Sequence, residues 1–265
     1  MESFGYTRRY TAYLFFIIIS CLLYSTAQSA SLLVSEQRLV RSQGNVGSAT
    51  SYRAWTVEEQ SPKTFGTFDH AVDEVRTTGT NSASAGASMT SDITASVFSA
   101  TASTDGMISI NEPSVYSSSN ANSRAFFEVT FQVLVPTPFA LTGSLSFLKN
   151  EGSARGSAYL NLFDGTSYAD TFNIFLGENS AYNDFSQNIV LSGMLDPDTY
   201  TLRAQASAEG YGYSPVAIQS GSAAFDFDFL LGSAALAAVP VPAAAWLFGS
   251  ALGLLVWMRR RGDYS

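Results

Sequence analysis

Short segments in which apolar and polar residues alternate dominate the chain from Arg124 onward. In "RAFFEVTFQVLVP" the apolar residues share one face, and they are Phe127, Val129, Phe131, Val133 and Val135. Glu128, Thr130 and Gln132 point to the opposite side. A period of two is typical of a strand that is buried on one face, so we predict a half-buried strand here.

The same alternation recurs in four later segments, 139–147, 156–163, 170–176 and 199–208, separated by Gly, Asn, Asp or Pro residues. Between Ser31 and Gly232 no stretch has a convincing helical period longer than two turns. Repeated strands joined by polar turns favour an all-β domain. We therefore predict an antiparallel β-sandwich that is jelly-roll-like.

The preceding region, 28–123, has a weaker pattern and is rich in Ser, Thr and Ala. Its segment Thr77–Thr104 is nearly low-complexity, and two interpretations stay open for it. It is either a flexible connector or a set of polar strands whose small residues pack against a neighbouring sheet. Ser119–Ser123 is predicted to be a loop. We expect 28–123 to form one domain with a β-sandwich core at 124–238.

The N-terminus has the three parts of a secretory signal peptide. Arg8 and Arg9 are followed by the apolar run Tyr13–Tyr24 and then by the small residues of Ser25–Ala30. We predict a signal peptide at 1–27 that signal peptidase cleaves after Ala27. An alternative is lipidation of Cys21, but apolar residues follow this cysteine where a lipoprotein usually turns polar.

The C-terminus predicts a membrane anchor. The apolar, uncharged run 243–258 follows Pro242 and is long enough, counted from Val239, to cross a bilayer as a helix. A basic cluster then holds that end in the cytoplasm under the positive-inside rule, and it comprises Arg259, Arg260 and Arg261. With an exported N-terminus, the body between the two segments is expected outside the cell.

The closing segment "VPVPAAAWLFGSALGLLVWMRRR" resembles the C-terminal sorting signals of the PEP-CTERM class, particularly the VPLPA type. The resemblance covers residues 239–261 of the terminal region 239–265. It implies processing by an exosortase, a membrane-embedded cysteine protease or transpeptidase. The recognised motif would be Val239, Pro240, Val241 and Pro242.

Charge and cysteine content exclude several classes of function. The 265 residues carry a net charge of −8, and Arg8, Arg9 and the terminal arginines lie outside the body, which is therefore more acidic still. This balance argues against a nucleic-acid partner. The lone Cys21 lies in the predicted signal peptide, so the mature protein is expected to have no disulfide, no thiol nucleophile and no cysteine metal ligand. We predict no cofactor.

Candidate chemistry in the body is sparse. His70 has no partner motif, and an ordinary strand residue is the favoured interpretation over a general base or metal ligand. Asp226 and Asp228 share one strand face; a solvent-facing acidic edge is favoured over a calcium site, which needs more oxygen ligands than a strand supplies. Tyr211 and Tyr213 either stack on sugars or fold over the edge of the sandwich.

No G-x-S-x-G, H-E-x-x-H or P-loop motif occurs in the sequence. We therefore expect no catalytic residues and predict an exported, non-catalytic surface or extracellular-matrix protein that an exosortase sorts. The alternative is a carbohydrate-binding module that uses the tyrosines or a sandwich face to bind extracellular polysaccharide. A third hypothesis is a secreted carboxylate-dependent glycoside hydrolase, because paired carboxylates leave no local signature.

Overall fold

The computed structural model describes the body of the chain, at 31–48, 51–61, 63–111, 118–151, 154–165, 170–177, 184–213, 217–232 and 234–235. The predicted cleavage site at Ala27, the sorting motif Val239–Pro242, the apolar run 243–258 and the cluster Arg259–Arg261 lie outside the described residues. Within the described ranges, no helix has the length and apolarity needed to cross a membrane.

Twelve antiparallel strands form two six-stranded sheets in the described ranges. In order across the sheet, sheet A contains β2 (Tyr52–Gln60), β1 (Ser31–Gly47), β6 (Ser118–Val133), β11 (Asp198–Tyr213), β8 (Arg155–Asp164) and β9 (Asp170–Gly177). Sheet B contains β10 (Asp184–Leu195), β7 (Thr137–Glu151), β12 (Ala217–Leu231), β5 (Val97–Ile110), β4 (Asn81–Ile93) and β3 (Gly66–Thr78). The predicted all-β sandwich is confirmed.

The last eight strands pair as one nested hairpin. The pairs run from the outside inward as β5 with β12, β6 with β11, β7 with β10, and β8 with β9. Successive strands from β5 to β8 and from β9 to β12 alternate between the sheets. Folding such a hairpin over itself gives the connectivity of a jelly roll.

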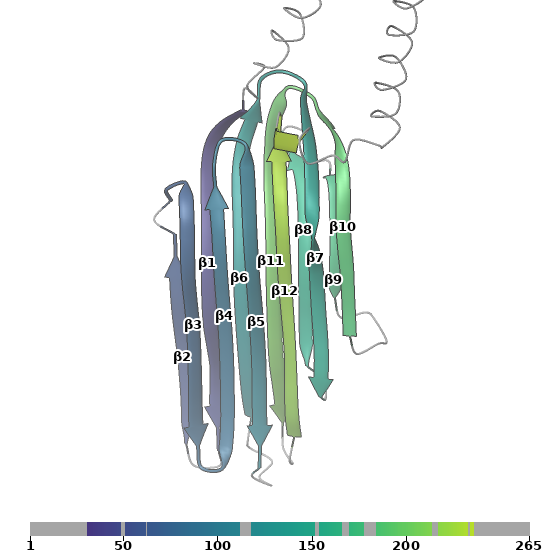
Figure 1. Cartoon of the computed structure of the whole chain (residues 1–265). Helices are drawn as coiled ribbons and strands as arrows, with labels where there is room; N and C mark the ends of the chain where they lie inside the picture. The colour runs from purple at the N-terminus through teal and green to yellow at the C-terminus, as the bar shows by residue number, and fades with distance from the viewer. Residues whose placement is uncertain are drawn as a thin grey trace, which may run out of the picture.

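The first four strands widen both sheets of this unit at one side. The hairpin of β1 and β2 adds to sheet A beside β6, and the hairpin of β3 and β4 adds to sheet B beside β5. In Figure 1, β2 and β3 therefore lie at one side of the sandwich and β9 and β10 at the other. The predicted division between 28–123 and 124–238 falls inside β6, where both parts share the same sheet.

The core lies between the inner faces of the two sheets and is aromatic at its centre. Phe98 packs against Phe131 with ring centroids 5.1 Å apart, and Phe127 meets Phe227 edge-on at 5.2 Å. Phe229 stacks on Phe98 at 5.8 Å. These rings come from alternate positions on three strands, so the period of two read from the sequence correctly identifies the buried face.

Between β4 or β5 and the facing sheet A, the two sheets meet through small residues. Ala83, Ala85 and Ala87 of β4 are buried on the inner face. A Cβ built on Gly106 of β5 would lie 2.9 Å from the carbonyl oxygen of Ala121 in sheet A. The low-complexity segment Thr77–Thr104 thus includes β4 and much of β5, and the interpretation as polar strands packed against a neighbouring sheet is confirmed.

One local prediction is wrong. Ser119–Ser123 is not a loop but part of β6, which starts at Ser118 and pairs with both β1 and β11. Ser and Asn favour turns by local hydrogen bonding, yet tertiary pairing overrides that preference here. The buried Ser123 hydroxyl donates a hydrogen bond to the carbonyl of Ala208, 3.3 Å away.

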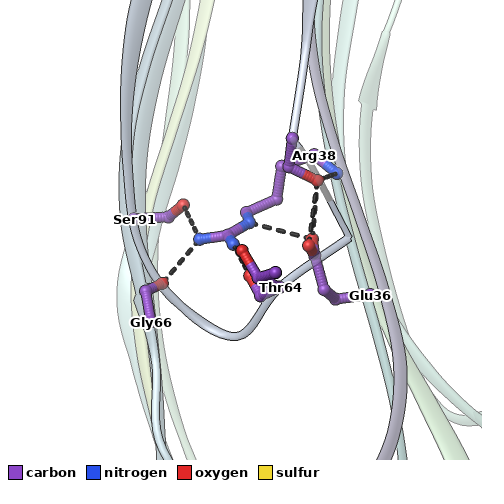
Figure 2. Close-up of polar contacts among 6 residues, drawn as sticks. Glu36, Arg38, Thr64, Gly66 and Ser91 are labelled. Carbon is purple, nitrogen blue, oxygen red and sulfur yellow. Dashed lines mark hydrogen bonds and ion pairs between the residues drawn. The ribbon is translucent and has the colours of Figure 1, made fainter.

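A buried arginine joins the two sheets near the edge of the sandwich (Figure 2). Arg38 of β1 is fully buried, and its guanidinium donates to the carbonyl oxygens of Thr64 and Gly66, each at 2.6 Å. Its Nε donates to the carboxylate of Glu36 at 2.9 Å, and Ser61 donates its hydroxyl to that same carboxylate. These bonds tie the segment that leads into β3 of sheet B to β1 of sheet A.

Candidate functional site

The outer face of sheet A carries four arginines and several outward-facing aromatic side chains among the described residues. The strand register places Arg41 of β1 opposite Arg124 of β6, followed by Ser207 of β11 and Ser157 of β8 in the same row. The two serine hydroxyls are 3.1 Å apart and share a hydrogen bond. We call this surface the sheet A face, and it comprises Arg41, Asn122, Arg124, Phe126, Glu128, Arg155, Ser157, Tyr159, Asn161, Phe175, Arg203, Gln205, Ser207 and Glu209.

The neighbouring row of the sheet A face contains its aromatic rings. Phe126, Gln205, Tyr159 and Phe175 stand side by side on β6, β11, β8 and β9. The Tyr159 hydroxyl donates to the Gln205 side-chain carbonyl at 3.3 Å. Phe175 is 61% exposed, so this ring offers an apolar surface to solvent.

A shallow hollow of about 290 Å³ lies in this surface. Asn122, Arg155, Ser157, Ser207 and Glu209 supply polar groups to its lining, and the Phe175 ring forms part of its wall. The hollow is thus bounded by hydroxyl, amide and charged groups with one aromatic ring. Such a combination of a few polar groups around an apolar surface is typical of small-molecule sites.

A partly exposed ion pair organises the next row. Arg203 pairs with the carboxylate of Glu128, to which its Nε donates at 2.7 Å, and its guanidinium lies over the ring of Phe163 at 5.2 Å. Arg124 lies 4.9 Å above the Phe126 ring, which explains why this outward phenylalanine is buried. Cation–π contacts of this kind hold each guanidinium group close to an aromatic ring.

Some polar atoms of the sheet A face are buried without a hydrogen-bond partner among the described residues. These atoms are the Nε of Arg41, the Nε of Arg124 and the side-chain oxygen of Asn161. Burial lowers the pKa of Arg124, although this guanidinium stays protonated, and burial raises the pKa of Tyr159. A buried donor without an acceptor, or a buried acceptor without a donor, is costly. The two arginine Nε atoms are therefore suited to an acceptor on a ligand, and the Asn161 oxygen is suited to a donor.

The outer face of sheet B has a different character. Its rows consist mainly of Ser, Thr, Ala and Asp, as in the row Asp69, Thr90, Thr101, Asp226. Desolvation raises the pKa of Asp105, and the charge of Asp73 raises it further. The described residues include no group of three His, Cys, Asp or Glu side chains that could hold a metal ion.

The structure places the predicted acidic pair on this face. Asp226 and Asp228 are exposed, as expected, but they lie on β12 between β7 and β5, so the prediction of an edge position is wrong. Asp226 accepts a hydrogen bond from the Thr101 hydroxyl at 2.6 Å. β12 becomes central because it closes the nested hairpin, and the local sequence does not show this.

Two further candidates are also placed. His70 is an exposed residue of the edge strand β3, with its ring 4.6 Å from that of Phe68. Tyr211 lies near the end of β11 on the same side of sheet A as Ser207 and Glu209. The sandwich-face alternative for sugar binding and the Tyr211 alternative thus fall on one surface. The Tyr213 side chain is outside the described residues.

The sequence prediction did not find most of the sheet A face. Arg41, Arg124, Tyr159 and Phe175 lie on four strands, and no local motif connects them. Each does, however, occupy an outward position of its strand, and the aromatic residues Tyr159 and Phe175 are unusual there because such positions more often hold polar residues. That signal singles out each residue but does not show that they are neighbours.

No protein-family model matches the sequence, and no curated protein matches it. Among solved structures, the infectious bursal disease virus VP2 subviral particle is 10% identical with a TM-score of 0.26, over 79% of this chain and 59% of that chain. The enzymatically active domain of bacteriophage CBA120 tailspike protein 4 is 12% identical with a TM-score of 0.21, over 62% of this chain and 19% of that chain. The chain spans only part of the length of both proteins, and similarity at this level carries no argument about function.

Proposed function

We propose that the protein is an exported, non-catalytic surface or extracellular-matrix protein that binds polysaccharide through the sheet A face. In this proposal its C-terminal segment, with Val239–Pro242 as the motif, is a sorting signal that an exosortase processes. The arrangement that carries the proposal is the exposed Phe175 ring beside a hollow lined by hydroxyl, amide and charged side chains.

The chemistry of this surface suits a sugar. The apolar face of a pyranose ring stacks on an aromatic side chain, and its hydroxyls need donors and acceptors nearby. Phe175 supplies the ring, while Ser157, Ser207 and Asn122 supply hydroxyl and amide groups. An open, shallow face also accommodates a polymer, because the chain can enter and leave at both sides.

The sequence of the two termini supports export. A signal peptide at 1–27 and a basic-ended apolar segment at 239–261 would place the body outside the cell, where polysaccharides are the abundant polymer. Because residues 239–261 also resemble PEP-CTERM signals, the proposal adds that an exosortase processes the exported protein.

The binding proposal is tested on an array of bacterial, algal and plant polysaccharides with the full chain purified in a mild detergent. We expect specific binding, and we expect Phe175→Ala to weaken it about tenfold, which corresponds to ~1.4 kcal/mol. Phe65→Ala, which removes another exposed ring, is the matched control and should bind as the unmodified protein does. Absence of binding to every glycan, or equal binding by Phe175→Ala, would refute the proposal.

The sorting proposal is tested separately by intact mass of the exported protein. In a host with an exosortase, the unmodified chain should lose its C-terminal segment, whereas a Pro240→Ala, Pro242→Ala variant should keep it. Proline keeps the preceding residue extended and lacks an amide, which leaves unwound backbone for a protease. A C-terminus that still ends at Ser265 in both proteins would contradict processing.

A further inference from the structure

Two arginines on the sheet A face lie directly opposite each other. Arg41 of β1 and Arg124 of β6 are register partners, so their Cβ atoms are about 5 Å apart. Like charges at this spacing repel each other and destabilise the strand pair. The rest of the described body is predominantly acidic, which makes a pair of neighbouring cations here unexpected on composition alone.

The acids nearby neutralise this pair only in part. Glu128 is engaged by Arg203, to which it is bonded at 2.7 Å. Glu58 reaches Arg41 at only 4.0 Å, beyond hydrogen-bond distance, and both side chains are partly exposed. Arg124 forms no ion pair with another described residue: its guanidinium lies over Phe126, and its Nε is buried without an acceptor. The pair thus has positive charge and hydrogen-bond donors to spare.

We infer that Arg41 and Arg124 form an anion subsite and that the polysaccharide is therefore acidic, with a carboxylate or sulfate group on its sugars. This inference rests on the proposed function and deepens it by naming the ligand class. Arginine suits the role because its planar fork binds an oxyanion through two parallel hydrogen bonds.

The position of the subsite fits a polysaccharide that lies across the strands of sheet A. Arg124 on β6 and Phe175 on β9 are three strand spacings apart, roughly 14 Å. The Ser207–Ser157 hydroxyl pair lies between them, in the same row as Arg124. A short oligosaccharide can therefore stack on Phe175 at one end and place an anionic group between the arginines at the other.

The same surface disfavours a densely charged polymer. Glu58, Glu128 and Glu209 face the same side, and sheet B carries further carboxylates. Nucleic acid, with a phosphate at every nucleotide, would meet these acids as well as the arginines. A polysaccharide with uncharged hydroxyls around each anionic group matches a surface on which arginines, serines and glutamates are mixed.

The test compares polymers that differ in charge, two of which, polygalacturonate and its methyl ester, share one backbone. The full chain is titrated with polygalacturonate, with its methyl ester and with a sulfated galactan, and single-stranded DNA is the competing polyanion. We expect at least one of the two acidic glycans to bind about tenfold or more tightly than the neutral ester. Whether it is polygalacturonate or the sulfated galactan identifies the anionic group.

Variants then assign the preference to the pair. Arg124→Gln and Arg41→Gln should each remove most of the preference for the acidic glycan, while Arg124→Lys keeps the charge and part of the preference. Arg76→Gln removes an exposed arginine on the edge strand β3 and should leave the preference unchanged. Far-UV circular dichroism and melting temperature confirm that each variant is folded.

The outcomes separate this inference from the proposed function. Equal binding of acidic and neutral glycans, or a preference that survives both Gln substitutions, overturns the anion subsite and leaves sugar binding intact. DNA binding as tight as glycan binding overturns the polysaccharide assignment. Self-association of the chain that either Gln substitution abolishes would instead identify the occupant as a second copy. Binding to no glycan at all overturns both the inference and the proposed function.

Discussion

Replacing Arg38 with Met tests whether the buried ion network holds the segment that leads into β3 against β1. Methionine fills much of the same volume but removes the charge and every donor. The Glu36 carboxylate, whose side chain is 0% exposed, then loses its cationic partner, and the carbonyls of Thr64 and Gly66 lose theirs. Removing one member of a buried ion pair costs about 3–5 kcal/mol.

That magnitude is a large part of the stability of a domain, which is about 5–15 kcal/mol in total. The assay is urea unfolding monitored by far-UV circular dichroism, with the free energy taken by linear extrapolation. Arg76→Met is the control, since the Arg76 side chain is 44% exposed in its pair with Glu74, and it should cost less than ~1 kcal/mol.

A double variant, Arg38→Met with Glu36→Leu, removes both charges and leaves none buried. It should be more stable than Arg38→Met alone, because the cost of the single change comes from an uncompensated carboxylate. The reasoning is refuted if Arg38→Met costs no more than Arg76→Met. It is also refuted if the double variant loses as much as the two single variants added together.

Two further predictions concern packing and charge. Gly106→Ala should lower the free energy of unfolding by about 1–3 kcal/mol in the same urea assay, because the new Cβ would lie 2.9 Å from the backbone oxygen of Ala121 in the facing sheet. An unchanged unfolding midpoint would contradict close contact of the sheets there. Asp105→Asn should raise the melting temperature at pH 7. Burial first, and then Asp73, raise the pKa of Asp105 in the folded state, so the wild-type protein loses stability as the pH rises from the ordinary pKa to the raised one. The gain over wild type should therefore grow across that interval and shrink at lower pH, and a gain that is the same at every pH would refute the charge argument.

Much of the fold follows from local pattern. The alternation in "RAFFEVTFQV" shows which side of β6 is buried, and Phe127, Val129 and Phe131 do lie in the core. Side chains point to opposite faces of a strand at every step, so the backbone itself turns a sequence period of two into a buried and an outer face. The absence of a helical period likewise predicted the all-β architecture of the described body.

The small-residue half of the body was harder to predict because its pattern has little contrast. Ser and Ala alternate in "NSASAGAS", and both residues are small and only weakly selective between the core and solvent. Ala83, Ala85 and Ala87 are buried because the facing sheet comes close enough to need residues of that size. Only the packing of one sheet on the other distinguishes these small-residue strands from a flexible connector.

The sequence alone predicts the period of each strand, the acidic balance of the body and the targeting segments at 1–27 and 239–261. It does not distinguish Arg38 from Arg41 in "SEQRLVRS", although the first is buried between the sheets and the second faces outward beside Arg124. The partners of these arginines come from residues as distant as Ser91 and Arg124. Strand order and register bring such residues together, and these depend on pairing across the whole chain, so only the tertiary structure decides where an anion or a buried ion pair can be held.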